Sequence, residues 1–138
     1  MTIISIYDIA TGRIIRTLNC SNELDLTNNI VEGETYIIGD YNNLYYIENN
    51  TPILKSEKPG NDYFFNYTSK SWIINIESVK NTIKNRRNIL LLNSDWTQLP
   101  NSPLTLQQQQ AWTTYRQALR DIPGQTGYPL NVVWPTLP

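Results

Sequence analysis

The sequence predicts an α+β protein: an N-terminal antiparallel β-sheet region over residues 1–70, then a helical hairpin with an extended tail rich in Pro and Trp over residues 71–138. Three observations lead to this division into two domains. Short β-branched and aromatic segments alternate with turn residues in the first half. Apolar residues recur at helical spacing after residue 75. Three of the four tryptophans lie after residue 93.

The first four expected strands are short and separated by turn signals. "TIISIYD" (residues 2–8) stops at "ATG", and "RIIRTLNC" (residues 13–20) follows at hairpin distance. "ETYIIG" (residues 34–39) and "NLYYIEN" (residues 43–49) flank "DYN". This spacing predicts a second hairpin between those two segments.

The remaining strands lie on either side of a polar loop. "TPILK" (residues 51–55) follows "NN", a third turn signal, and "SEKPGND" (residues 56–62) carries charge, Pro and Gly. "YFFNY" and "SKSWIIN" then predict a final hairpin that turns around residues 68–70. A boundary between the two domains is expected near residue 70.

The first expected helix starts near Ile76. Its apolar stripe contains Ile76, Val79, Ile83 and Leu90. Between them lie four basic residues, Lys80, Lys84, Arg86 and Arg87. No aromatic residues are interleaved with them, so we interpret the basic run as a solvated helix face rather than a nucleic-acid site.

The second expected helix has clear start and stop signals. Thr105 and Gln108 have the spacing of a capping box, and Pro123 with Gly124 ends the segment. One face carries Trp112, Tyr115, Leu119 and Ile122. We expect this face to pack against the stripe of the first helix in an antiparallel pair.

The tail, "GYPLNVVWPTLP", is too rich in proline for a helix or a central strand. Extended geometry leaves little conformational entropy to lose on docking. Tyr128, Val133 and Trp134 are the groups worth burying. They either pack back on the helical hairpin or anchor a partner.

The composition argues against an enzyme. Histidine is absent and Cys20 is the only cysteine, which removes the commonest general base and excludes a thiolate zinc site. Neither a Walker-type nor a GxGxxG motif is present. The carboxylates are densest at Glu23, Asp25, Glu32, Glu34 and Asp40. Their spacing does not bring any two of them together. We expect no catalytic site, no cofactor and no metal.

The charge balance does not favour two classes of partner. Eleven Lys and Arg against 12 Asp and Glu give a net charge of −1, so bulk attraction to nucleic acid or to an anionic membrane is absent. No stretch approaches the roughly 18 apolar residues of a membrane helix, and the N-terminus has no signal-peptide pattern. We expect a cytoplasmic protein with no nucleic-acid and no membrane partner.

Three blocks carry a family resemblance: "RRNILLLNSDWTQLPNSPLT", "AWTTYRQALRDIP" and "GYPLNVVWPTLP". In order and spacing they resemble the phage tail assembly chaperone family over about residues 71–138. Asn101 departs from the pattern, which has an acidic residue after "QLP". The first half, with "IYDIATGRI" and "LYYIENNTPI", resembles the N-terminal part of stand-alone members more loosely.

The resemblance implies a protein that acts in the host cytoplasm during phage tail or tail-fibre assembly and binds a tail-fibre or baseplate protein. The alternative is a structural adaptor that stays in the virion tail. The candidate residues for partner binding, or for defining the fold of the domain, are Tyr45, Tyr46, Asp95, Trp96, Trp112, Tyr115, Arg116, Arg120, Asp121, Tyr128 and Trp134.

Two of these expectations concern local structure. Asp95 is expected to cap a short turn around Trp96. Arg116, Arg120 and Asp121 are expected to form an intradomain ion pair and to match the charge of a helix C-terminus, with partner contact as the alternative. Tyr45 and Tyr46 belong to a strand whose edge offers a site for strand addition.

Overall fold

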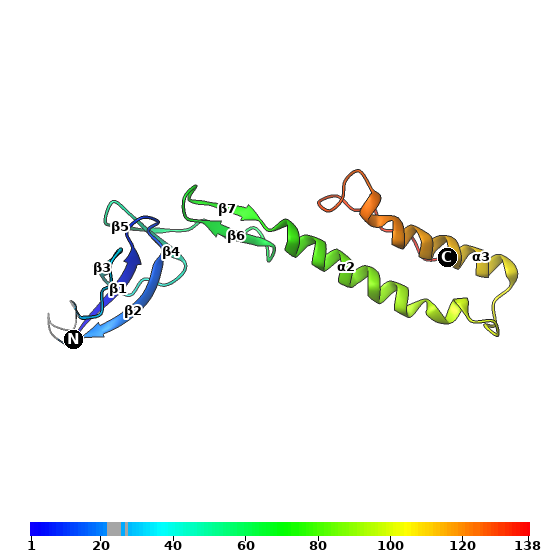
Figure 1. Cartoon of the computed structure of the whole chain (residues 1–138), viewed down its shortest axis with the longest axis horizontal. Helices are drawn as coiled ribbons and strands as arrows, with labels where there is room; N and C mark the ends of the chain where they lie inside the picture. Colours follow the sequence, from blue (N-terminus) through cyan, green and yellow to red (C-terminus); the bar gives the residue numbers. More distant parts are fainter. Residues whose placement is uncertain (22–25, 27) are drawn as a thin grey trace. The chain divides into compact units, whose positions relative to one another are not determined.

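The computed structural model describes residues 1–21, 26 and 28–138 (Figure 1). The chain divides into two compact units, Met1–Ile73 and Ile74–Pro138. Strands occupy the first unit and two long helices occupy the second, so the α+β prediction is confirmed.

The largest sheet in the N-terminal unit has three antiparallel strands in the order β2-β1-β3. These strands are β1 (Thr2–Asp8), β2 (Ile14–Cys20) and β3 (Glu34–Ile38). The central strand contributes Ile4 and Ile6, which are fully buried beside Cys20. Cys20 is therefore a small apolar core residue.

Two separate hairpins complete this unit. The strands β4 (Tyr45–Glu48) and β5 (Thr51–Leu54) form one, and β6 (Tyr63–Asn66) and β7 (Ser71–Ile74) form the other. Asn49 and Asn50 connect β4 to β5 with φ angles of 49° and 58°. Two consecutive positive φ angles are the geometry of a two-residue hairpin turn. The hairpin predicted at "NN" and the last hairpin, predicted around residues 68–70, are both confirmed by these strand pairs.

The hairpin predicted across "DYN" is wrong, because β3 pairs with β1 and β4 pairs with β5. The Ser5 hydroxyl of β1 explains the difference. Its Oγ donates to the carbonyl oxygen of Gly39 at 2.8 Å and accepts the amide of Tyr41 at 2.8 Å. The chain leaving β3 is thus held against β1 and does not fold back on β3.

An ion pair links two edges of the three-stranded sheet region. Both Arg16 terminal nitrogens donate to the Glu34 carboxylate, at 2.8 and 2.7 Å. These bonds hold the pKa of Glu34 below its ordinary value. A carboxyl whose pKa is depressed by folding stabilises the fold above its unfolded pKa, and the contribution disappears as the pH falls through the folded pKa.

Glu34→Gln is therefore expected to lower the melting temperature at pH 7, with a difference from the parent protein that shrinks below about pH 4.3, the ordinary Glu pKa. Thermal unfolding at pH 7, 5 and 3 measures this. Glu32→Gln, at an exposed position two residues earlier, is the control and should change little. An equal Glu34→Gln difference at pH 7 and pH 3 would contradict the prediction.

The C-terminal unit is an antiparallel pair of helices, α2 (Ile76–Asn93) and α3 (Leu106–Asp121) (Figure 1). The short 3-10 helices η1 (Asp95–Gln98) and η2 (Ile122–Gly124) follow them. The predicted capping box is confirmed: Thr105 Oγ1 accepts from the Gln108 amide, and Gln108 Oε1 accepts from the Thr105 amide.

The core of this unit is the predicted face of α3. Tyr115, Leu119 and Ile122 are buried. Partly buried apolar residues from α2, α3 and the tail surround them: Ile83, Leu90, Leu91, Trp112, Tyr128, Val132 and Trp134. The two expected helical stripes therefore meet.

We propose that the two units are separable domains. The C-terminal unit has its own core and its own helix caps. A fragment of residues 74–138 is expected to be helical and to unfold cooperatively, as measured by circular dichroism at 222 nm. A fragment that is unfolded while the full chain folds in one transition would show that both units depend on a shared core.

Candidate functional site

The corner between α2 and α3 is built around Arg116, which is buried although it is charged. Its Nη1 donates to the carbonyl oxygen of Leu91 and to Ser94 Oγ, both at 2.7 Å, and its Nη2 donates to Asp95 Oδ1 at 2.7 Å. Leu91 is in the last turn of α2, where carbonyl groups lack helical partners. Arg116 thus places a positive charge at the negative end of the helix dipole.

Two buried hydroxyl residues complete this corner. Ser94 Oγ donates toward the carbonyl oxygens of Leu90 and Leu91, at 2.9 and 3.0 Å, and Thr97 Oγ1 donates to the Ser94 carbonyl at 2.6 Å. Neither residue is among the candidates that the sequence predicts. Their only signal was their place inside the "SDWTQLP" block, which the structure shows to be a packed corner.

Asp95 does not cap the turn, contrary to expectation. No side chain accepts a hydrogen bond at the start of η1, because the Asp95 carboxylate is directed to Arg116 and Ser94 Oγ bonds carbonyl groups of α2. Asp121 instead accepts from Gln117 at 2.9 Å, and Arg120 is exposed in the last turn of α3. Of the three expected polar residues, Arg116 alone belongs to the corner.

Aromatic rings pack beside this corner. Trp112 makes edge-to-face contacts with Trp96, at 6.1 Å between ring centroids, and with Tyr115, at 5.6 Å. Tyr115 is buried, Trp112 is half-buried and Trp96 is 46% exposed. The exposure of these three candidate side chains therefore increases from Tyr115 through Trp112 to Trp96.

Four large apolar side chains on either side of the end of α2 are exposed, and we call them together the apolar ridge. Large side chains recur at steps of three, four and three residues through the end of α2 and η1. They are Ile89, Leu92, Trp96 and Leu99, with 57%, 70%, 46% and 60% of their surface exposed. Exposed apolar side chains are typical of protein-binding surfaces where they gather on one face.

The tail returns to the helical pair. Tyr128 and Trp134 pack against the core cluster, and the Arg86 guanidinium lies 4.2 Å from the Trp134 ring centroid. Gln125 holds the tail through both atoms of its amide, which bond the backbone of Val133 at 2.8 and 2.9 Å. The Val133 side chain is exposed, and Val132 is the residue that packs on the core.

Tyr45 and Tyr46 lie in the N-terminal unit and are both half-buried. Tyr45 contacts the Tyr41 ring and Tyr46 contacts the Phe65 ring. The edge of β4 that faces away from β5 is partly covered, because Arg13 bridges to Tyr46 and the Ile47 amide donates to the Gly12 carbonyl at 2.8 Å. The expected free edge for strand addition is therefore interrupted at its centre.

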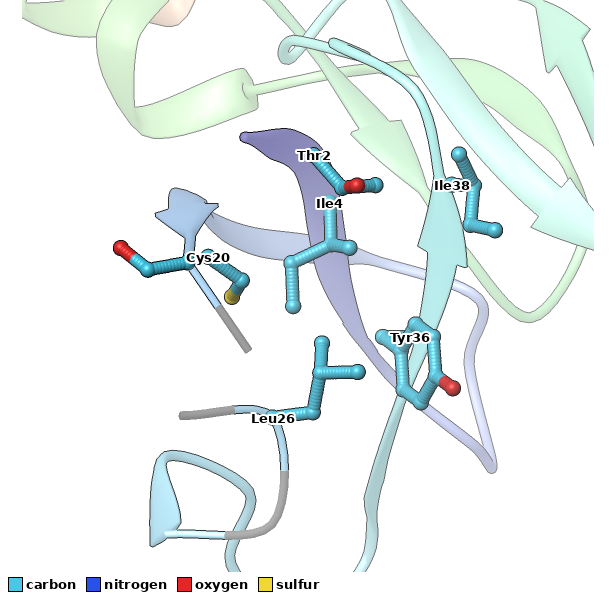
Figure 2. Close-up of a pocket in the computed structure, with 7 residues that line it drawn as sticks. Thr2, Ile4, Cys20, Leu26, Tyr36 and Ile38 are labelled. Atoms are coloured by element: carbon cyan, nitrogen blue, oxygen red, sulfur yellow. The ribbon is translucent and has the colours of Figure 1, made fainter. Parts of the chain in front are cut away.

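Figure 2 shows a pocket of about 340 Å³ beside β1, in which the Ile4 and Leu26 side chains approach each other and the Cys20 thiol lies nearby. The residues that line it bear no charge: Thr2, Ile4, Cys20, Ser21, Leu26, Tyr36 and Ile38. Within the described ranges, no three His, Cys, Asp or Glu side chains gather as a metal site requires. Glu23 and Asp25 lie outside the described residues.

Among the described residues, no helix is both long and apolar enough to cross a membrane.

The second unit is thus a two-helix domain with an Arg-centred corner and a tail packed on its core. Residues 80–138 match the family model described as phage tail assembly chaperone protein. No curated protein and no solved structure matches the chain. Residues 80–138 are thus similar to that family, in agreement with the resemblance of the sequence blocks.

The description of the matching family model names phage tail assembly. The match begins inside α2 and includes the corner, the ridge from Ile89 to Leu99, α3 and the tail. The looser resemblance of the first half stays a prediction.

Proposed function

We propose that this protein is a phage tail or tail-fibre assembly chaperone that binds a tail-fibre or baseplate protein in the host cytoplasm and leaves before the virion is complete. The observation that carries the proposal is the family match over residues 80–138. The matched residues lie in the C-terminal unit, which has its own core and its own exposed apolar side chains.

The apolar ridge supports a protein partner. Ile89, Leu92 and Leu99 each expose more than half of their surface. Burial of apolar area is the main favourable term in most protein association, at about 25 cal/mol per Å². A chaperone that covers apolar surface of an unassembled tail protein needs exposed apolar side chains of its own.

We propose no catalytic role. Arg116 and Asp95, the most closely paired charged groups of the matched region, are engaged with each other and with helix-end groups. These hydrogen bonds give both groups a structural role at the corner.

Co-expression tests the proposal. A tagged copy of this chain is produced together with the tail-fibre and baseplate genes of the same phage, and the bound proteins are identified after affinity purification. We expect one tail-fibre or baseplate protein to be retained. Leu92→Glu, on the ridge, should reduce its recovery, whereas Thr82→Glu, at an exposed polar position of α2, should not. Retention of no tail protein by the parent chain would overturn the proposal.

A further inference from the structure

A groove in the N-terminal unit collects positive charge. It has a volume of about 670 Å³, and we call it the cation groove. Its cationic lining residues are Arg13, Lys55 and Lys58, and its walls include the rings of Phe65 and Trp72. No carboxylate is among the described residues that line it, although the chain as a whole carries a net charge of −1.

Lys55 is held in place by neutral groups. Its ammonium donates to the carbonyl oxygen of Asn43 at 2.6 Å and to the Tyr67 hydroxyl at 2.7 Å. It also lies 4.7 Å from the Phe65 ring centroid and 4.6 Å from that of Tyr67. An ammonium group has three hydrogens, so these two bonds leave one to donate. The charge is therefore fixed in position but not neutralised by an anion.

The other two cations are more exposed. Lys58 Nζ lies 6.0 Å from the Trp72 ring centroid, and Arg13 projects from an exposed position. In the part of the chain that the structure describes, none of the three cations forms an ion pair. Asp8 and Arg13 both line an adjoining hollow and attract each other, although the Asp8 carboxylate accepts from the Thr11 amide and hydroxyl at 2.7 and 2.6 Å.

We propose that the cation groove binds an acidic peptide segment of the partner protein. Three positive charges without a lining carboxylate are complementary to side chains of Asp and Glu. The inference rests on the proposed function, because the partner is the tail protein that the chaperone holds. It assigns the N-terminal unit a binding role separate from the apolar ridge.

The walls of the groove favour a peptide over single-stranded nucleic acid. Phe65 packs edge-to-face against Tyr67, at 5.1 Å and 77°, and against Trp72, at 5.3 Å and 78°. Lys55 already covers the faces of Phe65 and Tyr67. Base stacking requires open ring faces along a continuous basic track. Carboxylates require only reachable cations, and the groove supplies these.

A spectroscopic test uses the distribution of tryptophans. Trp72 is in the N-terminal unit, whereas Trp96, Trp112 and Trp134 are in the C-terminal unit. We titrate the full chain with hexaglutamate peptide at low salt and follow the four indole N–H signals by ¹H–¹⁵N NMR. The Trp72 signal is expected to shift while the other three stay in place. Absence of a Trp72 shift would overturn the proposal.

A charge-matched pair of variants gives the control. Arg13→Gln with Lys58→Gln removes two groove cations, and Lys84→Gln with Arg120→Gln removes one Lys and one Arg at exposed positions of the other unit. The groove variant should bind hexaglutamate about 3- to 25-fold more weakly, since each exposed ion pair contributes modestly. The control variant should bind as the parent does. Equal weakening in both, or a larger Trp72 shift with hexathymidylate than with hexaglutamate, would refute an acidic-peptide site.

Co-purification separates this inference from the proposed function. If the parent chain retains the tail protein and the groove variant retains less of it than the control variant does, both proposals hold. If parent and groove variant retain it equally, the cation groove is not used and the inference fails alone. If the parent retains no tail protein, the proposed function fails, and with it the role of the groove in chaperoning.

Discussion

Arg116→Met is expected to destabilise the C-terminal unit by about 2–4 kcal/mol, because each hydrogen bond to a charged group contributes roughly 1.5–3 kcal/mol. The variant loses the bonds to Leu91, Ser94 and Asp95 but keeps an apolar stem of similar length. One term offsets part of the loss. The Arg116 Nε is buried with no hydrogen-bond partner among the described residues, and Met removes that unsatisfied donor.

Thermal unfolding followed at 222 nm measures this effect. For a unit of this size, about 1 kcal/mol corresponds to a shift of 4–8 °C, so the melting temperature should fall by more than about 8 °C. Arg120→Met is the control, one helical turn later and exposed, and should change the melting temperature little. Similar shifts for the two variants would show that the corner does not depend on Arg116.

Gly12→Ala is expected to have a still larger effect, in the N-terminal unit. Gly12 has φ +70°, and a Cβ there would lie 1.9 Å from the backbone oxygen of Ile47. Positive φ alone costs an ordinary residue about 1–2 kcal/mol. The clash adds to this cost because a backbone atom, unlike a flexible side chain, cannot move aside alone. We expect the β4–β5 hairpin to separate from the turn after β1, at a total cost above about 4 kcal/mol.

Hydrogen exchange at one amide reports this directly. The Ile47 amide donates to the Gly12 carbonyl at 2.8 Å and should lose its protection in Gly12→Ala. Gly33→Ala is the matched control, since Gly33 has φ +85° but no atom within 4 Å of the added Cβ. It bears the conformational cost without the clash and should leave Ile47 protected. Equal protection of Ile47 in both variants would refute the predicted steric conflict.

Local signals were sufficient for the helical unit. The capping box at Thr105 and the stripe from Trp112 to Ile122 are properties of neighbouring residues, and the structure contains both. The strand segments were predictable for the same reason. Strand pairing was not, because β3 pairs with β1 through a register in which Ser5 ties down Gly39 and Tyr41. Nothing near "DYN" encodes a contact with a residue more than thirty positions earlier.

In the candidate site too, features set by neighbouring residues could be predicted and long-range contacts could not. Trp112 and Tyr115 could be assigned to a packed face from helical spacing alone. The partners of Arg116 could not be predicted, because Leu91, Ser94 and Asp95 lie more than twenty residues earlier in the chain. The cation groove could not be predicted either, since Arg13 and Lys58 are far apart in the sequence and line one groove only in the folded unit.

The fate of the chain in the finished particle tests the central claim most directly. Quantitative mass spectrometry compares purified virions with the lysate of infected cells, with a tail-fibre protein as the internal reference. A chaperone that binds a tail protein and leaves should be abundant in the lysate and absent or substoichiometric in the virion. A fixed copy number matching the fibres would contradict the claim and identify the protein as a structural component of the tail.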